Sequence, residues 1–190
     1  MAVLHKLLSP ADFEAMIERG ELGEDKWYEL VGGEVICLPP PAVIHGWVTA
    51  LIMKALFPFA DIIGAVLLSE STGFITGGQH QQVRQPDVSL LAKERLRLLE
   101  GSPRLVAEAP DLAVEVLSPE QHGDAYAIPK VAEYLAAGSK VVWLADPETR
   151  TVKAYEAGKP EYTVYSGEDV ITLDAIAPGF AARVSSFFPA

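Results

Sequence analysis

Apolar residues recur along the chain at two spacings, and these spacings predict alternating helices and strands. A first helix is expected to begin after Ser9, a good capping residue, and to end at Gly20. Apolar positions at helical spacing predict a second helix over about residues 42–57 and a third over about residues 129–137. A proline suits the start of that third helix, so Lys130 is expected in its first turn.

Short runs of β-branched and other apolar residues, bounded by Gly, Pro or Asp, predict strands. Gly32-Gly33 between two such runs predicts a hairpin, because tight hairpin turns favour residues that tolerate positive φ. Further strands are expected over residues 65–69, 73–76, 88–91, 112–117, 140–145, 151–155, 162–165 and 170–173, with a polar loop over residues 77–85. The unit from 112 to 145 predicts a right-handed parallel crossover. We therefore expect one α/β domain over residues 1–190, with a mixed central β-sheet flanked by helices.

Charge bears on the expected partner. The chain has a net charge of −11, whereas proteins that hold a phosphate backbone usually carry a basic stripe. Its positive residues are scattered, with a loose group at Lys93, Arg95, Arg97 and Arg104. The acidity lowers the expected affinity for DNA, but net charge describes the whole surface rather than one cleft. A metal-bridged phosphodiester site therefore stays compatible with the sequence.

Cysteine content and hydrophobic runs indicate the compartment. Cys37 is the one cysteine, so no disulfide forms within the chain and a reducing compartment is expected. Its apolar neighbours predict that Cys37 is buried. The most apolar stretch, residues 48–68, is interrupted by Lys54, Pro58 and Asp61, which disfavours a membrane span. The amino terminus lacks the apolar stretch of a signal peptide. We expect a cytoplasmic protein with no membrane partner.

Carboxylates on strands that otherwise look like core are the main candidates for chemistry. Asp87 lies at the start of one predicted strand. Glu115 lies inside another, where a buried carboxylate is costly unless it is paired or bound to a metal. By strand alternation, Glu115 shares a face with Ala113. If the two strands are neighbours, the carboxylates converge, and two carboxylates with waters and a substrate phosphate satisfy Mg²⁺.

The order of several short motifs resembles a known family. The motifs are Pro86-Asp87, Glu115-Val116-Leu117-Ser118-Pro119, Lys130 and Tyr134 ahead of Gly138, Trp143-Leu144-Ala145-Asp146-Pro147, and, earlier, Tyr28 to Glu34 and His45 after the prolines. In this order they resemble the Uma-type family of "putative restriction endonucleases", over nearly the whole chain. That family is similar to the PD-(D/E)XK nuclease superfamily. The resemblance implies a restriction-endonuclease-like core whose site carries an Asp, a Glu or Asp, and a Lys.

Carried over to this chain, the resemblance implies that Asp87 and Glu115 ligate Mg²⁺ (or Mn²⁺). The superfamily's usual lysine, two positions after the second acid, is replaced by Leu117 here. The resemblance therefore implies that Lys130, on the next helix, takes its role. On a helical wheel Lys130 lies beside Tyr134, at the edge of the apolar stripe, from where it can reach inward.

The mechanism that follows is hydrolysis of DNA phosphodiester bonds. The ion would polarise the phosphodiester and lower the pKa of a bound water, and Lys130 would orient that water or stabilise negative charge. Glu29 is a candidate additional acid, which would support a second metal ion or a water. His45 is a candidate phosphate donor or auxiliary base.

Structural interpretations and two rival functions stay open. Asp87 and His45 could be capping residues, and Glu115 could form a buried salt bridge with Lys130. The same fold could serve as a non-catalytic binding or assembly module, which the net acidity and Leu117 support. The same fold could also hydrolyse small phosphoesters. A basic rim around Asp87 would favour DNA as the substrate, whereas a closed, narrow pocket would favour a small molecule. We expect a homodimer, by analogy with the family and from the short carboxyl-terminal strands.

Overall fold

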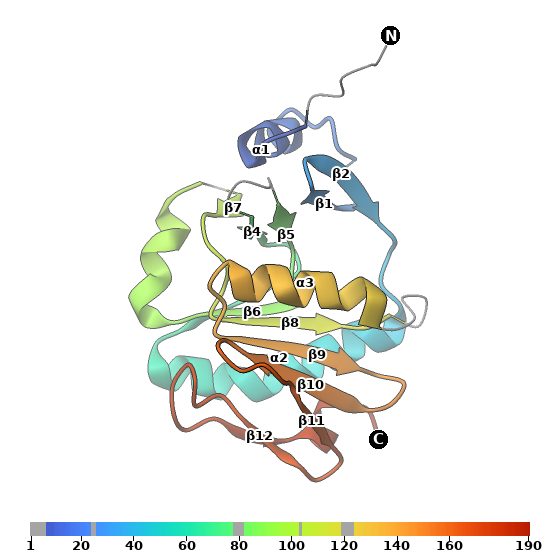
Figure 1. Cartoon of the computed structure of the whole chain (residues 1–190), viewed down its shortest axis with the longest axis vertical. Coiled ribbons are helices and arrows are strands. Elements are labelled where there is room, and N and C mark those ends of the chain that lie inside the picture. The colour runs from blue at the N-terminus through green and yellow to red at the C-terminus, as the bar shows by residue number, and fades with distance from the viewer. Residues whose placement is uncertain (1–6, 24–25, 78–81, 103, 119–123) are drawn as a thin grey trace.

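The computed structural model describes residues 7–23, 26–77, 82–102, 104–118 and 124–190. Helices pack against two main β-sheets (Figure 1). The helices are α1 (Pro10–Glu18), α2 (Val43–Ile63) and α3 (Asp124–Ala136), with short 3-10 helices η1 (Lys93–Glu100) and η2 (Val184–Phe187). The fold is therefore mixed α/β with mixed strand pairing, as the sequence predicts.

The larger sheet positions both predicted site carboxylates. Glu115 lies in one of its strands, and Asp87 directly precedes another. Its strand order is β11-β10-β9-β8-β6-β3. The strands are β3 (Val66–Ser69), β6 (Val88–Leu91), β8 (Leu112–Val116), β9 (Val141–Asp146), β10 (Thr151–Glu156) and β11 (Thr163–Ser166). β8 and β9 run parallel and are joined through α3, whereas the other neighbouring pairs are antiparallel. The parallel crossover between β8 and β9 was predicted from the sequence.

Helices α2 and α3 cover opposite faces of this sheet (Figure 1). Val48 of α2 packs in the main core with Leu112 and Val114 of β8. Val131 of α3 packs with Ala113 of the same strand. Each such fully buried aliphatic side chain contributes on the order of 1.5–3 kcal/mol. Because side chains alternate along a strand, the odd-numbered positions of β8 face α3, and the candidate site is built on that face.

A smaller sheet lies above α3 in Figure 1, with the order β2-β1-β5-β4-β7. Its strands are β1 (Trp27–Val31), β2 (Glu34–Leu38), β4 (Gly73–Ile75), β5 (Val83–Arg84) and β7 (Leu105–Val106). β1 and β2 form the predicted hairpin, and both of its turn residues, Gly32 and Gly33, have positive φ, at 59° and 82°. Phe13 of α1 is buried against Leu30 of β1 and Val83 of β5, so α1 covers this sheet.

The carboxyl-terminal segment closes the core on the α2 face. Strands β12 (Val170–Thr172) and β13 (Ala181–Arg183) form a separate two-stranded ribbon. Phe180 and Phe187 then pack against Trp143 of β9, with ring centroids 5.9 and 5.8 Å apart from that of the tryptophan. The end of the chain therefore stabilises the strand that follows α3.

Two helices run further than predicted, and each contains a proline. α2 continues to Ile63 with Pro58 inside it, and α3 begins at Asp124 rather than at Pro129. A proline inside a helix removes one backbone hydrogen bond, but both prolines are exposed, so water can satisfy the carbonyl left without its donor. The prediction that Lys130 lies in the first turn of its helix is therefore wrong, because the observed start places it in the second turn.

The smallest elements were also missed. The predicted polar loop over residues 77–85 contains β5, although residues 78–81 of that loop lie outside the described part of the chain. Strands β7 and β13 and helix η1 were not predicted either. β5 and β7, with two residues each, are too short to show a periodic pattern, so only their tertiary pairing defines them.

The predicted burial of Cys37 is wrong. Cys37 is exposed, and its thiol lies 3.8 Å from the Leu38 carbonyl oxygen. β2 is an edge strand of the smaller sheet, paired on one side with β1 alone. An apolar run on such a strand keeps one face in solvent, which explains why its apolar neighbours did not bury the cysteine.

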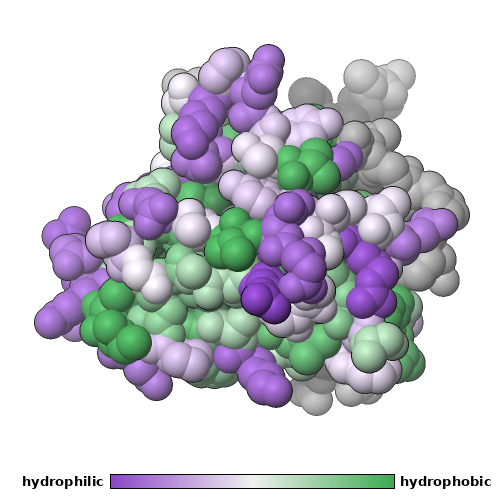
Figure 2. Space-filling view, turned by 90° about the horizontal axis from the view of Figure 1, so that it is seen from below, coloured by the Kyte–Doolittle hydropathy of each residue, from purple (hydrophilic) through white to green (hydrophobic). Residues whose placement is uncertain are grey.

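α2 is the one described helix that is long and apolar enough to cross a membrane, and 33% of its apolar window is buried. One face packs on the larger sheet, whereas the outer face carries apolar side chains. The exposed ones are Val43, Trp47, Phe57 and Ile62. On the face seen in Figure 2, broad hydrophobic surface is interrupted by hydrophilic side chains. α2 is thus a core helix with an apolar outer face.

Candidate active site

The first element of the site lies where β6 and β8 stop pairing. Their antiparallel register ends at Val88 and Val114, and one position further it sets Asp87 opposite Glu115. The Oδ2 atom of Asp87 accepts a hydrogen bond from the Val116 backbone amide at 2.6 Å. The same oxygen lies 3.1 Å from the His45 Nε2 atom. A backbone amide and a ring nitrogen therefore fix the Asp87 carboxylate at the end of the strand pair.

The second element is Glu115, whose two oxygens contact α3. Its Oε1 atom accepts a hydrogen bond from the Tyr134 hydroxyl at 2.8 Å, and its Oε2 atom lies 3.0 Å from the Lys130 ammonium. Lys130 and Tyr134 are four residues apart on α3, so they project from the same face of the helix. The burial of Glu115 was predicted to require a partner, and the structure provides two.

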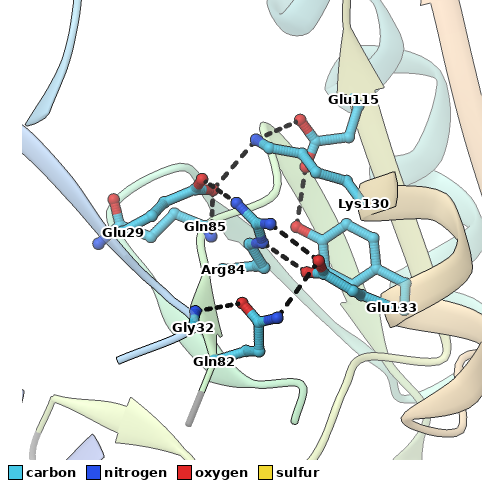
Figure 3. Close-up of polar contacts among 9 residues, drawn as sticks. Glu29, Gly32, Gln82, Arg84, Gln85, Glu115, Lys130 and Glu133 are labelled. Atoms are coloured by element: carbon cyan, nitrogen blue, oxygen red, sulfur yellow. Dashed lines mark hydrogen bonds and ion pairs between the residues drawn. The ribbon is translucent and has the colours of Figure 1, made fainter. Parts of the chain in front are cut away.

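The Lys130 ammonium also contacts Glu29, at 3.0 Å from its Oε1 atom. Arg84 donates to the other Glu29 oxygen at 2.7 Å and to both oxygens of Glu133, at 2.6 and 2.9 Å. Figure 3 shows these side chains as one continuous charge network of Glu115, Lys130, Glu29, Arg84 and Glu133. Through it, β1 and β5 of the smaller sheet are tied to β8 and α3.

A cavity of about 300 Å³ lies beside this network. Its polar lining comprises His45, Thr49, Glu70, Gln85, Asp87, Glu115, Ser118 and Lys130. Four of the five predicted site residues therefore share one cavity. The fifth, Glu29, is absent from the described lining, since its carboxylate is 1% exposed and contacts Arg84 and Lys130.

Negative charge is crowded at the cavity. Burial raises the pKa of Glu115 to about 7, and although Lys130 opposes this rise, the charges of Asp87 and Glu29 add to it. The pKa of His45 is raised above 6.5, because the hydrogen bond and charge of Asp87 outweigh the opposing effect of burial. The charge network itself contains three carboxylates and two cations. A proton or a metal cation at the cavity would relieve this excess.

The pKa of Glu115 is expected to fall in Asp87→Asn, because the charge of Asp87 contributes to its rise. Asparagine can still accept the Val116 amide hydrogen bond, so the fold should persist. Carbon-13 NMR of the glutamate carboxyls against pH measures the midpoint. An unchanged midpoint would contradict the proximity of the two carboxylates.

In the wild type, the raised pKa of Glu115 stabilises the folded state fully below pH 4.5. This contribution to the free energy of unfolding is lost as the pH rises through about 7.

Sequence reasoning missed three charged groups of the site. Arg84 and Glu133 hold the charge network together, and Glu70 lines the cavity at the end of β3. Arg84 lies in a two-residue strand and Glu133 on a helix that reads as solvent-facing there, so no pattern marks them. Tyr134, in contrast, is predicted from the sequence to lie near the site, because it shares a helix face with Lys130.

Fold and site together define a class: a mixed α/β protein with a lysine-paired glutamate and an aspartate at one cavity beside the end of a strand pair. The Uma2 family, described as "Putative restriction endonuclease", matches residues 10–185, so the chain belongs to this family. This confirms the resemblance inferred from the motifs.

One of five matching solved chains is described as "a putative nuclease belonging to DUF820" from Anabaena variabilis ATCC 29413. The TM-score is 0.74 at 20% sequence identity, and the match covers 90% of this chain and 96% of that chain. At this identity the similarity shows a common fold. No curated protein matches the chain.

Proposed function

We propose that this chain is a divalent-metal-dependent nuclease of the PD-(D/E)XK type that hydrolyses DNA phosphodiester bonds. The observation that carries the proposal is the meeting of Asp87, Glu115 and Lys130 at one cavity. The two carboxylates come from neighbouring strands, and the lysine reaches them from α3 rather than from position 117. Membership of a family described as restriction-endonuclease-like supports the same chemistry.

The residues present fit a magnesium or manganese ion. No cluster of three or more His, Cys, Asp or Glu side chains in the described residues is placed to hold a metal. Asp87 and Glu115, which line one cavity, would be its two protein ligands. Such a sparse oxygen set suits Mg²⁺, which keeps several waters and binds substrate phosphate. Burial is the main cause of the raised pKa of Glu115, and the charges of Asp87 and Glu29 add to it, so a cation is favoured there. When bound, the ion would supply Lewis-acid polarisation of the phosphodiester and acidify water.

The other residues act through their positions. Lys130, which is 6% exposed beside Glu115, orients the attacking water or neutralises charge that develops on the phosphate. His45 lines the cavity at the amino-terminal end of α2, where it serves as a phosphate donor or auxiliary base. Glu29 contacts Lys130 rather than the cavity, and with Arg84 it holds the lysine in place.

The decisive test is cleavage of supercoiled plasmid and of single-stranded DNA with Mg²⁺, with Mn²⁺ and with EDTA. Metal-dependent nicking or degradation by the wild type is expected. The absence of cleavage under all conditions, together with no calorimetric binding of Mg²⁺ or Mn²⁺, would reject the nuclease.

A non-catalytic binding or assembly module is the second candidate. The buried Glu115–Lys130 pair favours it, because such a pair satisfies both charges without a metal ion. Metal binding separates the two functions, since the module needs none.

A small-phosphoester hydrolase is the third candidate. Lys130 is the one Lys or Arg among the described residues that line the cavity, so the basic rim that would favour DNA is not found next to Asp87.

The proposed assembly is a cytoplasmic homodimer that pairs through the outer face of α2. Phe57 is 49% exposed on that face, between the exposed charges of Lys54 and Asp61. These charges are two helical turns apart. In an antiparallel pair with its twofold axis near Phe57, each Lys54 therefore meets Asp61 of the partner subunit.

Phe57→Glu is expected to convert the dimer to a monomer, because it places two like charges near the axis. Sedimentation velocity or light scattering measures the mass. Val164→Glu, on the exposed edge strand β11, is the matched control and should leave the dimer intact. A monomeric wild type, or loss of the dimer only in Val164→Glu, would reject this interface.

A further inference from the structure

Three hollows of the surface meet at Trp27, the first residue of β1. Trp27 lines the site cavity, a larger hollow of about 940 Å³ and a third of about 490 Å³. Gln85 lines both the site cavity and the larger hollow. The site cavity and the larger hollow therefore share parts of their walls, and Trp27 lies at the border between them.

The larger hollow, called the Trp27 groove below, is built by α1, β1 and β7 with the segments beside them. Lys26 and Arg104 line it and are both exposed, whereas Glu18 is the single carboxylate in its described lining. This balance is opposite to that of the whole chain, which has a net charge of −11. The hydroxyl side chains Ser71 and Thr72 add hydrogen-bonding groups. The groove therefore offers two cations and several hydroxyl groups that can contact backbone phosphates, whereas the site cavity has one cation in its described lining.

We infer that the Trp27 groove binds the nucleotides that flank the scissile phosphate in a single strand of DNA. The inference rests on the proposed nuclease function and specifies its substrate as an extended strand. Trp27 provides a stacking surface that accepts any base, while Lys26 and Arg104 contact the backbone phosphates. A base paired within a duplex is already stacked on its neighbours, so a half-buried ring in a groove wall selects unpaired bases. A small phosphoester would occupy the site cavity and leave the groove empty.

Binding is tested with fluorescein-labelled single-stranded DNA of about 12 nucleotides, by anisotropy in EDTA so that no cleavage occurs. Trp27→Ala is expected to weaken binding by about tenfold, and Trp27→Phe to retain most of it. The pair Lys26→Gln and Arg104→Gln should weaken binding and flatten its salt dependence. Trp47→Ala, on the outer face of α2, is the matched control and should bind as the wild type does.

Cleavage separates this inference from the proposed function. Trp27→Ala should lower cleavage of the strand by a much larger factor than hydrolysis of bis(4-nitrophenyl) phosphate, because the small ester does not reach the groove. Strand binding that depends on Trp27 in a protein that cleaves nothing would support the groove and reject the nuclease.

Three results would overturn the groove: unchanged strand binding in both Trp27→Ala and the double variant, equal loss of both hydrolytic activities, or tighter binding of duplex DNA or of RNA. If Trp27→Ala does not fold, strand binding and its salt dependence in the double variant decide the question.

Discussion

Glu115→Gln is expected to lower metal-dependent DNA cleavage by about 100-fold or more. The substitution removes one of two charged metal ligands, and each 1.4 kcal/mol lost from the transition state costs about a factor of ten in rate. Glutamine is nearly isosteric and can still contact Lys130 and Tyr134, so the protein should fold. Plasmid cleavage across a range of Mg²⁺ and Mn²⁺ concentrations measures the loss. Asp87→Asn is expected to lower DNA cleavage to a similar extent, while the hydrogen bond from the Val116 backbone amide is retained.

The matched control is Glu108→Gln. Glu108 is an exposed carboxylate that pairs with Arg95 and does not line the cavity. Glu108→Gln removes one carboxylate charge, as Glu115→Gln does, but away from the cavity. The cleavage rate of Glu108→Gln should therefore equal that of the wild type. Full activity in both Glu115→Gln and Asp87→Asn would assign the cleavage to a different site or to a contaminating enzyme.

Arg84→Met is expected to lower the free energy of unfolding by about 3–5 kcal/mol. Arg84 is 7% exposed and neutralises Glu29, which is 1% exposed. Its removal leaves that buried carboxylate with Lys130 as its cation and the Gln85 backbone amide as a hydrogen-bond donor. Breaking a buried ion pair from one side is more costly than replacing the whole pair, because the remaining charge stays desolvated. Urea denaturation followed by circular dichroism measures the change.

Arg19→Met provides the comparison, since Arg19 pairs with Glu21 on the surface and both side chains are largely exposed. No measurable change is expected there. Adding Glu29→Gln to Arg84→Met should recover part of the lost stability, because it removes the buried charge that Arg84 helps to neutralise. Equal stability of Arg84→Met and Arg19→Met would show that the buried network does not stabilise the fold.

Most of the fold could be predicted where the pattern was long enough. The Gly32-Gly33 hairpin and the strand–helix–strand unit with Glu115 have strong local signals, namely a glycine pair and an apolar run followed by helical spacing. The predicted end of α2 and the predicted start of α3 are wrong, because proline favours a helix boundary in sequence patterns. An exposed proline is tolerated inside a helix when packing holds the rest of it.

The candidate site divides in the same way. Asp87 and Glu115 could be found because a carboxylate on a core strand is conspicuous, and Lys130 because of the family resemblance. The contacts of Arg84 could not, since its partners Glu29 and Glu133 lie 55 and 49 residues away in the sequence. Only the approach of the smaller sheet to α3 places these three side chains together.

That packing has a consequence for the chain during its synthesis. Glu29 is made early, whereas Lys130 belongs to the last α-helix described. Contacts between residues so far apart form late, because a long loop must close before they are gained. A chain that is still emerging from the ribosome therefore holds its acidic residues without the lysine that sits between them. The proposed site therefore stays incomplete until synthesis has passed α3.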